Sequence, residues 1–144
     1  MDVLLSIRPF YVKNILQGTK KYEYRKSVPK NIVNRYYIYE SNSVQRIIGY
    51  FTCQNILSDT PMNIWNQTCK YGGISYLDYQ KYFKNRDKAY ALEIDTVYSF
   101  SIPVNPWSYN KFYPPQSFIY LKEGALYEKL CSDDASELVR LQEK

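Results

Sequence analysis

The chain has 144 residues, of which 45% are hydrophobic and 23% are charged, so it suits one domain with an ordinary core rather than a disordered segment. No apolar run is long enough to cross a bilayer, and the N-terminus lacks the basic and apolar regions of a signal peptide, so we expect a cytoplasmic protein without membrane contact. The net charge of +5 and the pI of about 9.0 fit a polyanionic partner.

The chain contains no His, which excludes the commonest general base, the Ser-His and Cys-His nucleophile pairs and His metal sites. Its three cysteines, Cys53, Cys69 and Cys131, are scattered and form no C-x-x-C pair. This spacing predicts free thiols in a reducing compartment. We therefore expect no metal site and no cofactor.

The first elements follow from alternation and from helix signals. Residues 3–7 alternate as in a strand, Pro9 suits the first turn of a helix, and Gly18 suits its end. The next predicted elements are a strand over 21–26, strands over 36–39 and 47–56, a short helix over 61–65, a turn over 71–73, and a helix opened by the capping sequence of residues 75–78.

The clearest pattern lies in residues 90–102 and predicts one long half-buried strand, or two strands joined by a bend. The positions predicted to face the core are Tyr90, Leu92, Ile94, Tyr98, Phe100 and Ile102. Glu93 is predicted to point to the opposite face. The remaining predictions are a proline-rich loop over 105–116, a strand over 117–121, a helix over 125–131 and a polar tail, frayed or helical, from residue 132. Because the order is not a regular βαβ repeat, we predict an α+β fold, with a coiled sheet closing into a small barrel.

One short segment concentrates charged residues after a turn. Gly18 frees the turn, Lys20 follows it, and Glu23 and Arg25 are two residues apart, hence on one face of a strand. All three converge only if the chain bends between Lys20 and Glu23, and such a bend would leave backbone N–H groups available to an anion. Arg25 would then fork onto a phosphate, and Glu23 would orient Arg25 or accept from a base. The alternative is an exposed edge strand with a solvated ion pair.

The pattern Gly18-x-Lys20-x-x-Glu23-x-Arg25 resembles the G-x-K-x-x-E-x-R signature of ASCH domains, which belong to the PUA-like superfamily. Flanking segments also resemble the family, so that the similarity extends over about residues 3–121.

This resemblance implies a PUA-like small β-barrel with flanking helices. We expect an ASCH/PUA-like domain over residues 1–131 and a polar C-terminal tail over residues 132–144. The resemblance also implies a cleft beside the signature that is used for RNA or for modified nucleobases.

Some ASCH proteins are amidohydrolases that act on N4-acetylcytidine, and others are ribonucleases. In the amidohydrolases the signature Lys is catalytic, which the resemblance carries to Lys20. Glu23, however, stands where those enzymes have a Thr, so a hydrolase here would need Glu23 or Glu93 as its base. Because the chain lacks His, we predict that any such activity is independent of metal.

Two further groups are candidates. Arg86, between Lys84 and Lys88, is a candidate phosphate contact, or alternatively part of a solvated turn. Trp107 and Tyr109 lie in the proline-rich loop and are candidates for stacking on a base, or for covering one end of the barrel.

The sequence thus supports three hypotheses. The leading one is a monomeric module that binds RNA, another single-stranded nucleic acid or a modified nucleoside through Lys20, Glu23 and Arg25. The second is a metal-independent hydrolase of a modified nucleoside or a ribonuclease that uses the same residues. The third is a protein-interaction adaptor that uses the aromatic loop.

Overall fold

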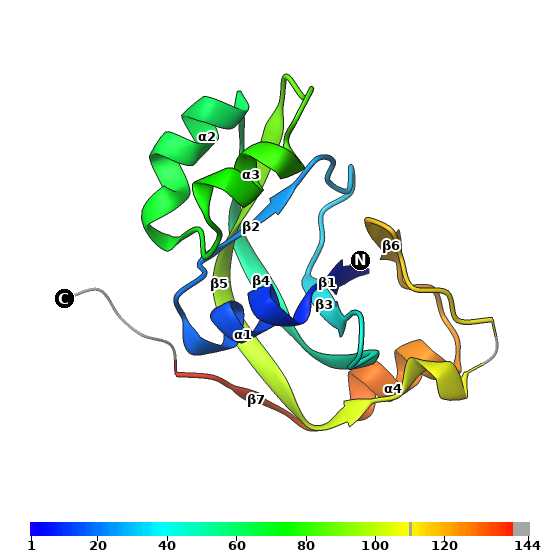
Figure 1. Cartoon of the computed structure of the whole chain (residues 1–144). Helices are drawn as coiled ribbons and strands as arrows, with labels where there is room; N and C mark the ends of the chain where they lie inside the picture. Colours follow the sequence, from blue (N-terminus) through cyan, green and yellow to red (C-terminus); the bar gives the residue numbers. More distant parts are fainter. Residues whose placement is uncertain (110, 140–144) are drawn as a thin grey trace.

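The computed structural model describes residues 1–109 and 111–139, and Figure 1 shows the arrangement of its elements. The strands of this part are β1 (Asp2–Ile7), β2 (Tyr22–Arg25), β3 (Arg35–Glu40), β4 (Arg46–Asp59), β5 (Ala89–Val104), β6 (Phe118–Tyr120) and β7 (Ala135–Glu137). Its helices are α1 (Pro9–Gln17), α2 (Pro61–Thr68), α3 (Tyr76–Tyr82) and α4 (Ala125–Ser132), with the short 3₁₀ turns η1 (Cys69–Tyr71) and η2 (Pro106–Ser108). The α+β class is confirmed.

The seven strands described form one mixed sheet in the order β2-β5-β4-β3-β1-β6, with β7 on the same edge of β5 as β2. Only β1 and β3 run parallel, and the other described pairs are antiparallel. The long strands β4 and β5 bend through the molecule, so that the sheet curls into an open half-barrel (Figure 1). The predicted coiled sheet is therefore present, with β2 at one end of the strand order and β6 at the other.

The helices begin and end where the local chemistry predicts. Pro9 opens α1, and Gly18 ends it in the left-handed conformation, with φ of 86°. The Ser75 hydroxyl accepts a hydrogen bond from the Asp78 backbone N–H, as the capping sequence predicts. These caps fix the two helices that later supply walls of the candidate site.

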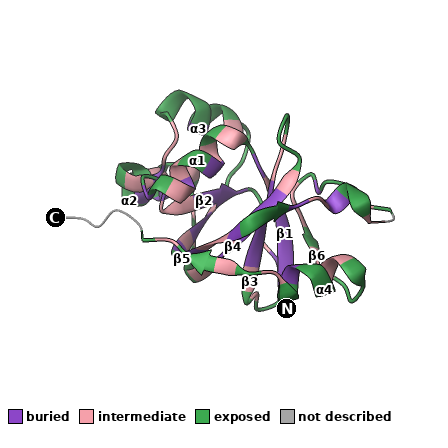
Figure 2. Ribbon diagram, turned by 90° about the horizontal axis from the view of Figure 1, so that it is seen from below, coloured by how far each residue is buried: buried purple, intermediate pink, exposed green. Residues whose placement is uncertain are grey.

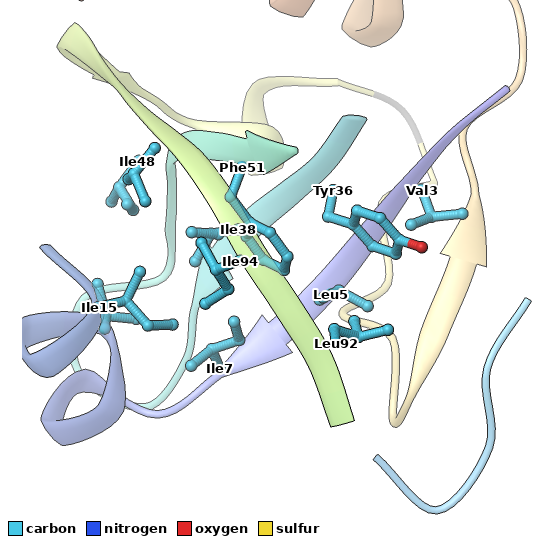
Figure 3. Close-up of a cluster of buried hydrophobic side chains, with 12 residues drawn as sticks. Val3, Leu5, Ile7, Ile15, Tyr36, Ile38, Ile48, Phe51, Leu92 and Ile94 are labelled. Carbon is cyan, nitrogen blue, oxygen red and sulfur yellow. The ribbon is translucent and has the colours of Figure 1, made fainter. Parts of the chain in front are cut away.

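The buried side chains form three clusters, and burial concentrates on the sheet (Figure 2). The largest cluster fills the concave face between the sheet and α1, where β1, β3, β4 and β5 converge (Figure 3). A second lies between the sheet and α4, and a third lies between β2 and the pair of helices α2 and α3. The third cluster anchors the helices that lie next to β2 in Figure 1.

The strict alternation predicted for β5 is only partly correct. Leu92 and Ile94 are buried as predicted, and Glu93 points away from them, but Tyr90 is half-buried and Ile102 is 76% exposed. The pairing of β5 with β4 shifts register around Cys53, so that Ile94 and Val97, three residues apart, both face the largest cluster. A bulge therefore moves the core-facing side from even to odd positions along the strand.

The C-terminal tail also differs from its prediction as a frayed or helical segment. Residues Ala135–Glu137 form β7, which pairs with Tyr98–Phe100 of β5. This stretch of β5 lies beyond the four residues that β2 occupies on the same edge, so the tail satisfies backbone groups that would otherwise be unpaired. Positions 140–144 of the predicted tail lie outside the described residues. No helix in the described ranges has the length and apolarity to span a membrane.

Candidate functional site

The turn between α1 and β2 is held rigidly by backbone hydrogen bonds. The N–H groups of Thr19 and Lys20 both donate to the Asn14 carbonyl, and the Lys21 N–H donates to the Tyr71 carbonyl. The predicted bend is present, but these N–H groups are used within the protein, so the expectation that they serve an anion is wrong. The turn instead fixes the direction of the Lys20 side chain.

Lys20 is buried, with 2% of its surface exposed. Its Nζ donates to the Gly72 carbonyl at 2.6 Å and lies 4.6 Å from the centre of the Tyr24 ring. Burial lowers the pKa of Lys20 to about 8, against a smaller opposing effect of Glu23, while Arg25 lowers it further. An amine with this pKa carries a proton at neutral pH and can release it there, which suits both anion binding and proton transfer.

Glu23 and Arg25 form a buried ion pair, each with 6% of its surface exposed. The Arg25 Nε and Nη2 donate to the same Glu23 oxygen, Oε2, at 3.0 and 2.6 Å. Arg25 also donates to the Ser6 carbonyl at 2.9 Å and to the Ser117 carbonyl at 3.1 Å. These four bonds use four of the five guanidinium N–H donors.

Arg25 thereby links the two ends of the open sheet. It lies on β2, while Ser6 belongs to β1 and Ser117 directly precedes β6. The strand order places β2 at one end of the sheet and the β1-β6 pair at the other. Arg25 is thus first a positioning residue, which holds Glu23 and closes the gap of the half-barrel. At most one of its N–H donors remains available to a ligand.

The side chains of Lys20, Glu23 and Arg25 line one cavity of about 530 Å³ between β1, α1, β2 and α3. The other residues that line it are Ser6, Ile7, Arg8, Tyr11, Tyr24, Ser41, Ile74, Asp78, Lys81, Tyr82 and Gln116. Four lining residues carry a positive charge (Arg8, Lys20, Arg25 and Lys81), and two carry a negative one (Glu23 and Asp78). The volume is in the range of small-molecule sites, and the charge balance favours an anion.

A glycine pair, Gly72 and Gly73, lies directly against the Lys20 side chain, and the sequence indicated only a turn there. Gly73 has φ of 62°, and a Cβ on it would lie 2.5 Å from the Lys20 Cβ. A Cβ on Gly72 would collide with the Tyr24 hydroxyl. The Gly72-Gly73 backbone therefore approaches the site closely because it carries no side chains. The Gly-Gly pair was the signal that could have indicated this contact.

Glu93 and Arg86 do not line this cavity. Glu93 faces the other side of β5, where it accepts from the Asn55 amide at 3.0 Å and from the Tyr22 hydroxyl at 3.5 Å. Arg86 lies exposed in the turn after α3. Of the two carboxylates considered as a base, the structure thus brings only Glu23 next to Lys20.

Trp107 and Tyr109 lie in a different part of the molecule. Trp107 belongs to η2 and packs edge-on against Phe112, at 5.1 Å between ring centres. Tyr109 lines a second, smaller hollow of about 380 Å³, with Lys129 and Asp133 of the α4 end on its other side. The structure therefore does not bring the aromatic loop to the signature residues.

Proteins with two different names have sequences similar to this chain. The chain is 30% identical over 97 residues to the large ribosomal subunit protein uL22 of Ureaplasma parvum serovar 3, which covers 67% of this chain and 31% of that protein. The chain thus spans about a third of that relative's length. It is also 25% identical over 130 residues, covering 85% of both proteins, to a protein of Zymomonas mobilis subsp. mobilis named ASCH domain-containing ribonuclease.

Solved structures support the same fold. The crystal structure of ASCH from Zymomonas mobilis superposes with a TM-score of 0.83 at 23% identity, covering 92% of this chain and 96% of that one. A single-residue variant of the same protein also gives a TM-score of 0.83, at 22% identity. The model of the ASCH domain family matches residues 5–97, which include the whole signature. The chain therefore belongs to the ASCH domain family.

Proposed function

We propose that this protein binds RNA, with a nucleotide held in the cavity beside β2. The observation that carries the proposal is the convergence of three buried charged side chains, Lys20, Glu23 and Arg25, on one cavity of about 530 Å³. Buried charges are costly, and folds retain them mainly where they do chemistry or fix a specific structure. The excess of positive charge around the cavity and the net charge of +5 favour a polyanion.

The walls suit the parts of a nucleotide. Tyr11 and Tyr82 give aromatic surface on which a base can stack, and Lys20 and Lys81 give ammonium groups for a phosphate. Glu23 offers acceptor oxygens for the N–H edge of a base. A modified nucleoside such as N4-acetylcytidine presents the same ring and edge, so it belongs among the ligands to be tested.

The binding experiment uses labelled single-stranded RNA, with N4-acetylcytidine as competitor and a chelator present. We expect Lys20→Met to weaken RNA binding about tenfold or more, since a charge-assisted hydrogen bond contributes about 1.5–3 kcal/mol. Lys13→Met is the matched control, because Lys13 is exposed on α1 outside the cavity. Equal affinities of wild type and Lys20→Met would refute the proposed site.

A second function, ribonuclease, is favoured by the pKa of Lys20 and by the relative named ASCH domain-containing ribonuclease. In this reaction Glu23 takes the proton of the ribose 2′-hydroxyl as that oxygen attacks the phosphorus. The bond from phosphorus to the 5′-oxygen breaks, and protonated Lys20 gives its proton to this leaving oxygen. The products are a 2′,3′-cyclic phosphate and a 5′-hydroxyl end, formed without an added metal.

Cleavage is tested by incubating end-labelled RNA with the protein in the presence of a chelator and identifying the new ends. Loss of a general acid or base lowers a reaction rate by about 10²–10⁴-fold. The rate of RNA cleavage by Lys20→Met and by Glu23→Gln should therefore each be lower than that of wild type by about 10²–10⁴-fold. Cleavage that is equal in both variants and wild type would come from a contaminant. Binding without cleavage by the wild type would leave the protein as a binding module.

A further inference from the structure

Basic side chains gather around Tyr82, where the cavity wall formed by α3 meets the end of β2. The Lys26 Nζ lies 4.6 Å from the centre of the Tyr82 ring, and Lys81 precedes Tyr82 and lines the cavity. Arg86 follows in the turn after α3. We call Lys26, Lys81 and Arg86 the basic rim.

Contacts with Tyr82 place these residues beside the signature. Burial raises the pKa of the Tyr82 hydroxyl, whereas the charges of Arg25 and Arg86 and a backbone hydrogen bond from Lys26 lower it. The charges of Arg25, which lines the cavity, and of Arg86, which does not, therefore both act on the Tyr82 hydroxyl.

The fold brings the rim together from separate segments. Lys26 directly follows β2, and Lys81 lies in the last turn of α3. Asn85 adopts the left-handed conformation, with φ of 61°, and the Arg86 N–H donates to the Phe83 carbonyl, so the chain folds back at the end of α3. All three cationic side chains are exposed. In residues 78–88, which include Lys81 and Arg86, four basic side chains stand against the two acidic ones of Asp78 and Asp87.

We propose that the ligand is a strand of RNA rather than a free nucleoside, and that the strand leaves the cavity past Tyr82 with its phosphates on the basic rim. This inference rests on the proposed function and names the class of ligand for the same cavity. A nucleoside carries no phosphate and gains nothing from cations outside the cavity. A strand carries one negative charge for every nucleotide, and phosphate contacts provide most of its sequence-independent affinity.

The proposal predicts a specific dependence on length and on salt. Each phosphate contact on a single strand contributes about −0.7 to the slope of log affinity against log salt. Replacing Lys26 and Arg86 together should therefore make the slope for a long strand shallower by about 1.4. It should also weaken binding of that strand about tenfold at low salt, while leaving a mononucleotide unaffected, because neither residue lines the cavity.

The experiment measures fluorescence anisotropy of a labelled RNA 12-mer, and competition by a mononucleotide, at several salt concentrations. The proteins are wild type, Lys26→Gln/Arg86→Gln and the control Lys30→Gln/Lys122→Gln. The control removes the same charge from two exposed lysines that do not line the cavity. Thermal unfolding of each protein confirms that the exposed substitutions leave the fold intact.

The outcomes separate the two proposals. The rim is supported when only Lys26→Gln/Arg86→Gln loses affinity for the 12-mer and shows the shallower salt slope. It is overturned when that variant matches wild type or the control, or when wild type binds the 12-mer no better than the mononucleotide, and in these cases the cavity itself still stands. Failure of wild type to bind either ligand overturns both proposals.

Discussion

The two hollows of this molecule both carry charged residues of either sign, but they differ in how far those charges are buried. In the cavity beside β2, Lys20, Glu23 and Arg25 are almost completely buried. In the hollow beside η2, Lys129 pairs with Asp133 at 2.9 Å, yet 47% of the lysine side chain is exposed. The first pair of opposite charges is removed from water, whereas the second is an ordinary surface pair along α4.

This difference is the one we expect between a functional cavity and a surface depression. Each buried ion costs several kcal/mol of desolvation, which its partners only partly offset, whereas exposed pairs cost and contribute little. A fold that keeps a lysine, a glutamate and an arginine buried around one cavity gives up stability there. Such a concentration is typical of sites under functional constraint. The following predictions test whether the two hollows differ in this way.

The largest effect is expected for Arg25→Ala. The substitution leaves the Glu23 carboxylate buried without its partner and removes the bonds to the Ser6 and Ser117 carbonyls. Breaking a buried pair in this way typically costs about 3–5 kcal/mol, so the free energy of unfolding should fall by that amount. Chemical denaturation measures it. A loss below about 1 kcal/mol would show that Arg25 does not link the sheet ends as described.

The next effect is a pH dependence of binding that arises from Lys20. With a pKa of about 8, Lys20 is cationic at pH 7 and neutral at pH 9. Affinity for RNA should therefore fall by about tenfold as the pH rises through 8, since a charge-assisted hydrogen bond of about 1.5 kcal/mol is lost. Titration with adenosine-only RNA avoids ionisation of the bases. Lys20→Met should show a flat profile, and a flat profile of the wild type would contradict the assignment.

A smaller effect is expected for Gly73→Ala. Gly73 has φ of 62°, where a residue with a Cβ costs roughly 1–2 kcal/mol, and the new Cβ would press on Lys20. Stability should fall by about that amount, and RNA affinity should fall with it because Lys20 is displaced. Gly124→Ala is the contrasting control, since a Cβ there meets no atom within 4 Å although its φ of 153° also disfavours a side chain. A fall in stability without any change in affinity would separate Gly73 from the site.

The smallest effects are expected at the second hollow and in the neighbouring turn η2. Trp107→Ala and Lys129→Ala should change RNA affinity by less than about twofold, because Trp107 carries no charge and the exposed charge of Lys129 lies outside both the cavity beside β2 and the basic rim. Both residues lie away from the cavity beside β2. The same binding assay measures these variants. A tenfold loss of RNA affinity in Trp107→Ala would show that the aromatic loop, and not the cavity beside β2, is the better candidate for the RNA-binding site.

The sequence predicted the central part of the site because simple local rules apply there. Residues two apart on a strand share a face, which correctly places Glu23 beside Arg25. Gly18 correctly indicated the turn that brings Lys20 to the same cavity. What the local pattern could not give is the partner of Arg25 across the sheet, because the Ser117 carbonyl is 92 residues away in the chain.

Other features depend on tertiary context. The bulge between β4 and β5 reverses the core-facing side between Ile94 and Val97, and alternation alone cannot show a shift imposed by the neighbouring strand. The polar residues of β7 have no strand pattern of their own and pair only because an edge of β5 is exposed there. Glu93 was correctly placed on the face opposite Leu92, but the sequence could not show that this face lies outside the cavity.

The most direct test of the account is photocrosslinking of a 4-thiouridine-containing RNA, followed by mass spectrometry of the modified peptides. The account predicts adducts in the cavity beside β2, on Tyr11 or Tyr82, and their loss in Lys20→Met. Adducts confined to the loop that carries Trp107 and Tyr109, and unchanged in Lys20→Met, would contradict it.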